Sequence, residues 1–377
     1  MIKIPDSEAS MKSRAAVLFE PNTKLEICDV DLSEPKPGEV CIQLKAAGVC
    51  HTDYSVMKGL LNAPLPAILG HEGAGIVVAI GEGVSNIKVG DHVIPLWRLS
   101  CGECELCKKR RPALCPVGSE IRSSGRMSDG ESRFRFKGKE IFHFAGVSSF
   151  SNFTVIPEGA VLKIPKDIPF ELAALIGCSV ITGVGSVMNA ADVSSDSSIA
   201  VFGAGGVGVN VIQGAVLAGA KEIIAIDQFD SRLEQAKAFG ATKLINSKIN
   251  DPVSMIREIT DQRGVDFAFE AVGLSVTIQQ AFDSLAKTGK TIVIGIPSND
   301  THISISAVPL VFEERTITGS LYGSAAPKLD IPNMIKLYED GKLNLDSLLT
   351  DRYPLEEINE AYDAMIKGES LRSVIVF

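Results

Sequence analysis

The chain has 377 residues, a formal net charge of −9 and a sequence pI near 5.2. This length predicts two domains, since one ordinary core accounts for roughly 150 residues. The acidic balance leaves no broad basic face for phosphates, so we expect small-molecule partners and no nucleic acid. The N-terminal residues lack the apolar core of a signal peptide, and we expect no uncharged apolar stretch of about 18 residues. We therefore expect no membrane contact and a cytoplasmic protein.

Residues 14–100 predict a β-rich first region. Short apolar runs are interrupted by glycine and proline, and a turn cluster covers 34–39. The pattern is not that of strands alternating with helices. The predicted strands cover residues 14–20, 39–48, 75–81 and 91–97.

The segment 98–116 holds four of the eight cysteines. The spacing C-x-x-C-x-x-C-x7-C lets a short loop wrap one tetrahedral zinc ion, and a cytoplasmic protein keeps its thiols reduced. A zinc ion held by four thiolates has no open position, so this lobe would be structural. An iron–sulfur cluster is the main alternative, and packed free thiols are another. The predicted ligands are Cys101, Cys104, Cys107 and Cys115, and the basic run 108–111 would offset their charge.

From about residue 198 the pattern changes to strands alternating with helices. Such alternation predicts a doubly wound parallel sheet with helices on both faces. We place this domain at residues 181–321. The predicted strands are 198–205, 222–227, 243–246, 265–273 and 291–297, and the predicted helices include 231–241 and 277–290.

Residues 322–377 are too few to form a domain of their own. They include a predicted helix over 355–368 and end in a strand-like run over 373–377. We therefore expect this tail to rejoin the first domain, so that residues 1–180 and 322–377 form one unit.

A nucleotide-binding fingerprint follows the first strand of the parallel sheet. G-x-G-x-x-G directly after an apolar strand permits a tight turn, and the helix that it opens can receive a pyrophosphate. The next strand ends in Asp227, whose carboxylate can accept hydrogen bonds from ribose hydroxyls and would repel a 2′-phosphate. The sequence thus predicts NAD rather than NADP. The fingerprint residues are Gly203, Gly205, Gly206, Val207 and Gly208.

Four cysteines remain outside the loop. Cys28 and Cys41 lie in strand-like runs and are interpreted as buried hydrophobic residues. Cys50 opens the sequence CHTD, and His71 follows in a glycine-rich turn, where a histidine alone could be an ordinary polar residue. A zinc site at Cys50 and His71 needs a further ligand, and Cys178 is the available thiol.

The run GHEGAGIVVAIGEGV at 70–84 resembles the signature of zinc-type alcohol dehydrogenases, and the four-cysteine loop is similar to the structural zinc lobe of that family. With the nucleotide fingerprint, the chain resembles a medium-chain zinc-containing alcohol dehydrogenase from about residue 14 to its end. The long segment 117–155 after the lobe is similar to the long-loop, dimeric branch. The resemblance implies a GroES-like catalytic domain and a Rossmann domain, with the cofactor in the cleft between them.

By this resemblance, Cys50, His71 and Cys178 hold a catalytic zinc whose fourth position takes water or the substrate oxygen. Two thiolates and a neutral imidazole give a formally neutral centre, a stronger Lewis acid than the four-thiolate centre. Asp53 resembles the carboxylate that accepts the other N–H of the histidine ligand. Glu72 corresponds to the acidic residue behind the zinc, although it could also be a structural carboxylate near an arginine.

The resemblance also suggests a proton relay. Thr52 matches the hydroxyl residue that binds the alcohol oxygen and begins the relay. Well-known members carry a histidine where this chain has Ser55, which is no base near neutral pH. Water or His51 could take over that role, although His51 matches a residue near the cofactor pyrophosphate.

Other matches concern the cofactor and the substrate. Thr182, Arg232 and Arg372 match positions that contact the adenosine ribose or the phosphates, though each could be a surface or capping residue. Trp97, Phe144 and Ala145 match the substrate pocket and favour apolar or aromatic alcohols, while Trp97 could also be ordinary core packing.

We interpret the chain as a zinc-dependent dehydrogenase that transfers hydride between an alcohol and NAD, with two zinc ions per subunit. One alternative is an S-(hydroxymethyl)glutathione (formaldehyde) dehydrogenase, whose acidic glutathione-binding residue would fall near Leu61 here. A non-enzymatic alternative is a zinc-braced nucleotide-binding regulator. The resemblance implies a homodimer formed through edge strands of the Rossmann sheet, near residues 301–308.

Overall fold

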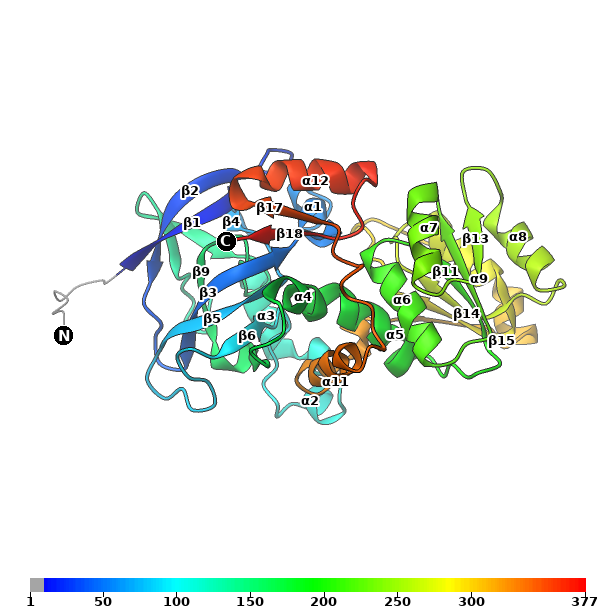
Figure 1. Cartoon of the computed structure of the whole chain (residues 1–377), viewed down its shortest axis with the longest axis horizontal. Coiled ribbons are helices and arrows are strands. Elements are labelled where there is room, and N and C mark those ends of the chain that lie inside the picture. Colours follow the sequence, from blue (N-terminus) through cyan, green and yellow to red (C-terminus); the bar gives the residue numbers. More distant parts are fainter. Residues whose placement is uncertain (1–9) are drawn as a thin grey trace. The chain divides into compact units, whose positions relative to one another are not determined.

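The computed structural model describes residues 10–377, which form two compact units (Figure 1). The first unit comprises the chain up to Cys178 together with Leu349–Phe377, and the second comprises Ser179–Leu348. Residues 322–348, which we had expected in the first domain, thus belong to the second unit. The reason is local packing: α11 (Pro327–Glu339) packs on α5 (Ile181–Ala190), and the backbone N–H of Asn344 donates to Gln213 at 2.7 Å.

A small closed barrel forms one half of the first unit. Its strands follow the order β1-β2-β7-β8-β4, and β1 pairs with β2 along nearly its whole length. Alternate inward side chains such as Val30 and Leu32 are fully buried in its core. The strands are β1 (Ser10–Leu18), β2 (Glu26–Ser33), β4 (Ala67–Ile68), β7 (Phe134–Phe136) and β8 (Lys139–His143).

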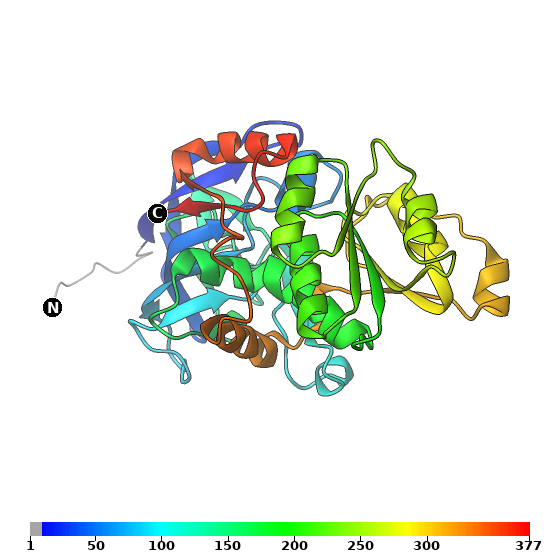
Figure 2. The same cartoon turned by 45° about the vertical axis from the view of Figure 1, so that its right-hand side comes forward.

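A second sheet carries the elements that position the site. The strands predicted over 39–48, 75–81 and 91–97 are confirmed as its β3, β5 and β6. The C-terminal strand β18 pairs with β3, and Figures 1 and 2 show the red strand beside the blue one. The strands are β3 (Glu39–Gly48), β5 (Gly73–Ile80), β6 (His92–Pro95), β9 (Phe153–Pro157), β10 (Val161–Lys163), β17 (Asp351–Pro354) and β18 (Ser373–Val376).

Short helices complete this unit. Helix α4 packs on β3 and β5, and the predicted helix over 355–368 is confirmed as a short 3₁₀ turn followed by α12. Gly368, in the left-handed conformation at φ 74°, ends α12. The helices are α1 (His51–Met57), α2 (Glu105–Lys108), α3 (Pro116–Ser124), α4 (Phe170–Leu175) and α12 (Ile358–Lys367).

The second unit contains a parallel sheet of six strands in the order β13-β12-β11-β14-β15-β16. This is the strand order of a doubly wound dinucleotide-binding fold, as predicted. Helices lie on both sides of its strands in Figures 1 and 2. The strands are β11 (Ser198–Phe202), β12 (Glu222–Asp227), β13 (Lys243–Asn246), β14 (Val265–Glu270), β15 (Leu285–Val293) and β16 (Thr316–Gly319). The remaining helices are α6 (Gly206–Leu217), α7 (Asp230–Ala238), α8 (Pro252–Ile259), α9 (Ser275–Asp283) and α10 (Ala307–Phe312).

One prediction in this unit is wrong. The helix predicted over 277–290 ends with α9 at Asp283, because residues 285–290 begin β15 and pass through a bulge with Thr288 at φ 63°. Within the single chain, residues 301–306 pair with no strand, and the edge strand next to β15 is β16. The dimer contact predicted near residues 301–308 requires a second copy, so it stays a prediction.

The expectation that no long apolar stretch exists is also wrong. Phe170–Ala190 is helical, and it is long and apolar enough to cross a membrane. Most of this stretch is buried inside the protein, where α4 packs on β3 and β5 and α5 packs on α6. The core helix of a globular protein meets the same criteria of length and composition.

A buried ion-pair network ties the segment after the four-cysteine loop to β3. The Arg133 side chain is 1% exposed and donates two hydrogen bonds to Glu39, at 2.9 and 2.6 Å. It also donates to Asp129 at 2.8 Å, and Lys36 pairs with Asp129 at 2.7 Å. Since Glu39 begins β3 and Arg133 precedes β7, this network joins the barrel to the second sheet.

We expect Arg133→Ala to destabilise the protein by about 3–5 kcal/mol, because the change strands the buried Glu39 carboxylate without its partner. Urea unfolding followed by circular dichroism would measure the loss. Arg126→Ala is the matched control, since Arg126 pairs bidentately with Glu140 in the same segment but is 38% exposed. The control should cost about 1 kcal/mol or less. Equal losses for the two variants would contradict the role of the buried network.

Candidate active site

Four buried side chains of the first unit meet at one point. One ligand atom from each of Cys50, His71, Glu72 and Cys178 lies within 4.8 Å of the others. Strand pairing explains the meeting of the first three, because Ala47 near the end of β3 faces Gly73 at the start of β5. Cys178 comes from the π-helical turn Ile176–Val180 that follows α4. The structure therefore brings together the three residues that we predicted as ligands.

Asp53 orients the histidine. Its Oδ2 lies 3.0 Å from Nδ1 of His71, and its Oδ1 accepts the backbone N–H of Gly70 at 2.8 Å. The other ring nitrogen of His71, Nε2, lies 3.4 Å from Sγ of Cys178. The imidazole thus presents Nδ1 to a carboxylate and Nε2 to the sulfur cluster, as expected of a histidine ligand.

Glu72 is paired with Arg372 in the same buried region. One carboxylate oxygen of Glu72 accepts a hydrogen bond from the Arg372 guanidinium, and its other oxygen is buried without a hydrogen-bond partner among the described residues. Gly48 makes room for this carboxylate, since a Cβ there would lie 2.0 Å from Glu72 Oε2. The prediction that Arg372 contacts the cofactor remains untested, and in the structure its partner is Glu72.

Burial and mutual contact shift the pKa values of these groups. Hydrogen bonding with Cys178, together with the charge of His71, lowers the pKa of the Cys50 thiol well below its usual value. The contact with Cys50 and burial raise the pKa of Cys178. Burial raises the pKa of Glu72 to about 7, although Arg372 opposes the shift. The pKa values of the two thiols are thus shifted in opposite directions.

Aromatic rings cover His71. The Trp97 ring centroid lies 5.5 Å from that of His71 and the Phe144 centroid lies 6.0 Å away, both in edge-on geometry. Ala145, next to Phe144, is buried with φ 55°. Thr52 contributes a hydroxyl oxygen 3.7 Å from Sγ of Cys50. The side chains beside the cluster thus combine apolar rings with one hydroxyl.

The donor set of this cluster fits zinc. Two sulfurs and an imidazole nitrogen are ligands that zinc prefers, and three protein ligands leave a position for a further oxygen. The carboxylate against Nδ1 of His71 matches the usual second contact of a zinc-bound histidine. The residues present therefore suit an open, catalytic type of site.

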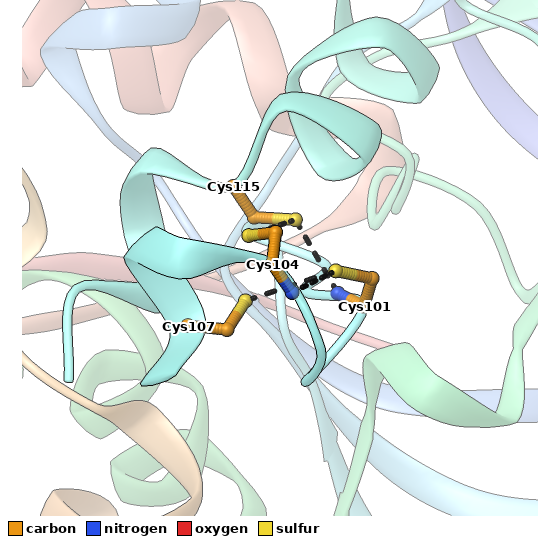
Figure 3. A group of neighbouring side chains, drawn as sticks. All are labelled: Cys101, Cys104, Cys107 and Cys115. Carbon is orange, nitrogen blue, oxygen red and sulfur yellow. Dashed lines mark hydrogen bonds between the residues drawn. The ribbon is translucent and has the colours of Figure 1, made fainter. Parts of the chain in front are cut away.

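The four-cysteine loop forms a separate cluster (Figure 3). Sγ of Cys101 lies 4.0 Å from that of Cys107, and Sγ of Cys104 lies 4.0 Å from that of Cys115. Four sulfurs around zinc lie about 3.8 Å apart when each zinc–sulfur bond is about 2.3 Å. Backbone N–H groups of Cys104 and Glu103 lower the pKa of Cys101 to about 6, whereas burial and the contact with Cys104 raise that of Cys107 to about 12. The spacing of the four sulfurs suits a closed tetrahedral site.

The glycine fingerprint of the second unit has the predicted placement. Gly203 follows β11 with φ 93°, and a Cβ on Gly208 would lie 1.7 Å from the Gly203 carbonyl oxygen. Helix α6 begins at Gly206, so its first turn, which includes Val207, offers backbone N–H groups at the carboxyl edge of the sheet. Gly205 has no neighbour within 4 Å of an added Cβ.

Asp227 lies at the end of β12, beside this turn. It accepts the backbone N–H of Ala204 at 2.8 Å and that of Phe229 at 3.0 Å. The Arg232 guanidinium lies over the Phe229 ring at 4.9 Å. Thr182 is buried on α5, and His51 is exposed at the start of α1. Gly48 and the linked hydroxyls of Ser186, Ser320 and Ser324 form no sequence motif, so they were not predicted.

The chain is similar to known dehydrogenases over almost its whole length. The family model described as "Alcohol dehydrogenase GroES-like domain" matches residues 36–166, and the one described as "Zinc-binding dehydrogenase" matches residues 206–340. An "Alcohol dehydrogenase class-3" of Cereibacter sphaeroides is 42% identical over 97% of this chain and 100% of its own. An "S-(hydroxymethyl)glutathione dehydrogenase" of Escherichia coli is 40% identical over 97% of this chain and 100% of its own. The solved benzyl alcohol dehydrogenase of Acinetobacter calcoaceticus has a TM-score of 0.92 and 38% identity, covering 97% of this chain and 99% of its own.

Proposed function

Because the chain belongs to the medium-chain zinc-containing alcohol dehydrogenase family, we propose that it oxidises apolar or aromatic alcohols with NAD at the Cys50–His71–Cys178 site. The observation that carries this proposal is the meeting of these three buried donors beside Asp53 and Thr52. When bound, zinc favours loss of the proton from a hydroxyl group, and NAD takes up the hydride.

The chain's own residues prepare the alcohol. Asp53 holds His71 so that Nε2 points toward the sulfur of Cys178. The Glu72 carboxylate also lies beside the site, and its charge is paired with Arg372. The Thr52 hydroxyl lies close enough to Cys50 to hydrogen-bond a substrate oxygen and receive its proton. Ser55 gives this proton no basic acceptor, so it leaves through water or through the exposed His51.

The aromatic rings beside the site support an apolar substrate. Trp97 and Phe144 both stand edge-on to His71, and an aromatic alcohol could pack between such rings. By the family resemblance, the acidic residue that binds a glutathione adduct falls near Leu61, and Leu61 packs against the hydrophobic core of this unit. S-(hydroxymethyl)glutathione is the second candidate, favoured by the names of the relatives at 42% and 40% identity.

We also propose a cytoplasmic homodimer. The segment 302–306 is held on one side by α9, where Ser275 donates to the His302 carbonyl at 2.7 Å and Gln279 donates to that of Ser304 at 2.5 Å. Val311 and Phe312 on the neighbouring α10 are 73% and 81% exposed. A second copy could pair along the segment and cover these side chains.

Substrate choice can be tested with the purified protein. We expect kcat/KM with NAD to be at least about tenfold higher for benzyl alcohol than for S-(hydroxymethyl)glutathione, because the rings contact an aromatic substrate. Absorbance of the reduced cofactor would follow the reaction. Ethanol serves as a small control that reaches the site without filling the pocket. Turnover only in the presence of glutathione would favour the second candidate.

Zinc content tests the two proposed sites. We expect two zinc ions per chain by elemental analysis, one after Cys178→Ser and one after Cys107→Ser, because each change removes one ligand of one site. Only Cys178→Ser should abolish turnover while leaving the fold intact. Cys28→Ser is the control, since this buried cysteine lies outside both clusters. Bound iron would favour the iron–sulfur alternative, and one zinc in the wild type would favour the non-enzymatic regulator.

Cofactor choice depends on Asp227. We expect Asp227→Asn to lower the ratio of kcat/KM for NAD to that for NADP by about tenfold or more, because it removes a negative charge beside the 2′-position. Asp230→Asn is the control, a nearby exposed carboxylate that accepts from Asn246 at 2.6 Å. A wild-type preference for NADP would show that the role given to Asp227 is wrong.

A further inference from the structure

The turn after β16 is held in an unusual backbone conformation. Tyr322, Gly323 and Ser324 have φ values of 54°, 68° and 50° in succession. Positive φ is uncommon for residues other than glycine, and strain of this kind concentrates at functional sites where the surroundings enforce it. Tyr322 is 2% exposed, so this turn is buried and its surroundings can hold it in shape.

Helix α5 enforces this conformation. A Cβ on Gly323 would lie 2.2 Å from the carbonyl oxygen of Ile181, so the turn touches the helix backbone directly. Asn189 donates a side-chain hydrogen bond to the Gly323 carbonyl at 3.2 Å. The helix thus fixes the middle of the turn by contact and by hydrogen bonding.

A chain of serine hydroxyls links the same helix to both ends of the turn. Ser186 Oγ donates to the Thr182 carbonyl at 2.7 Å and lies 2.9 Å from Ser320 Oγ. Ser320 Oγ lies 3.3 Å from Ser324 Oγ. A hydroxyl has one proton, so Ser186 must accept from Ser320, and Ser320 from Ser324. The hydrogen bonds therefore run in one direction, from the turn to the helix.

This turn lies at the carboxyl edge of the parallel sheet. The backbone N–H of Ser320 donates to the carbonyl of Val293, the last residue of β15. The glycine fingerprint follows β11, and Asp227 ends β12, so the adenosine half of a dinucleotide belongs on the β12 side. A dinucleotide bound there would direct its nicotinamide half toward the ends of β14, β15 and β16. The strained turn would then lie next to the part of the cofactor that reacts.

We propose that Ser186 is a positioning residue for the nicotinamide half of the cofactor. Its hydroxyl anchors Ser320 and, through it, Ser324, and so holds the strained turn in the shape that the cofactor meets. Ser186 acts through the turn and needs no contact with the cofactor itself. The inference rests on the proposed function, because it requires NAD at this edge of the sheet.

Binding of two ligands to Ser186→Ala tests the proposal. NADH binding is measured by its fluorescence, and ADP-ribose, which lacks the nicotinamide ring, is measured by calorimetry. We expect the Kd of NADH to rise about threefold to tenfold, the effect of losing one hydrogen bond, while that of ADP-ribose changes less than about twofold. Ser320→Ala breaks the same series of hydrogen bonds at the next hydroxyl. It should raise the Kd of NADH to a similar extent and leave that of ADP-ribose nearly unchanged.

Ser284→Ala is the matched control. Ser284 is a fully buried serine of the same unit whose hydroxyl also donates to the carbonyl four residues earlier, at 2.7 Å, but it lies before β15 at the opposite edge of the sheet. It should leave both Kd values unchanged. Unchanged NADH binding in Ser186→Ala and Ser320→Ala, or an equal weakening of both ligands, would overturn the inference. Failure of the wild-type protein to bind NADH would instead overturn the proposed function.

Discussion

Buried charge beside Cys50, His71 and Cys178 is the constraint on which the first unit depends. Asp53 and Glu72 are both fully buried, and a carboxylate in such a place must have a partner. Arg372 supplies that partner for Glu72, and it precedes β18, the strand that pairs with β3 at Gly48. Because the C-terminal segment belongs to the first unit, the Arg372 guanidinium is held in place behind the site.

The balance of charge also distinguishes the two cysteine-containing clusters. Mutual contact shifts the pKa of the Cys50 thiol down and that of the Cys178 thiol up. A divalent cation would allow both to ionise and leave a formally neutral centre. The loop cluster has a different balance, since four sulfurs would exceed the charge of one zinc ion, and the exposed basic run 108–111 lies beside them. The first arrangement favours an electrophilic site, and the second favours a structural one.

The sequence predicted those features whose residues lie close together in the chain. The four-cysteine loop and the glycine fingerprint each fit within a short segment, so spacing alone located them. The end of α9 at Asp283 was missed because LAKTGK lacks a strong strand pattern, and its bulge depends on pairing with β14. The long apolar stretch Phe170–Ala190 was missed because Glu171 and several glycine, serine and threonine residues interrupt it, although its mean hydropathy is high. The strained turn after β16 could not be predicted, because no sequence pattern indicates positive φ at two residues other than glycine.

The separation of the ligands along the chain also sets an order of assembly. Cys101, Cys104, Cys107 and Cys115 lie within one loop, so closing a ring around an ion there costs little chain entropy. Cys50 and His71 converge only after β3 and β5 have paired, and Cys178 joins them only when α4 has packed on that sheet. Metal binding at the loop can therefore precede folding of the unit, whereas the active site exists only as its product. The active site forms only when these strands pair. The same pairing creates the backbone contact that holds Asp53 and the arginine contact that holds Glu72.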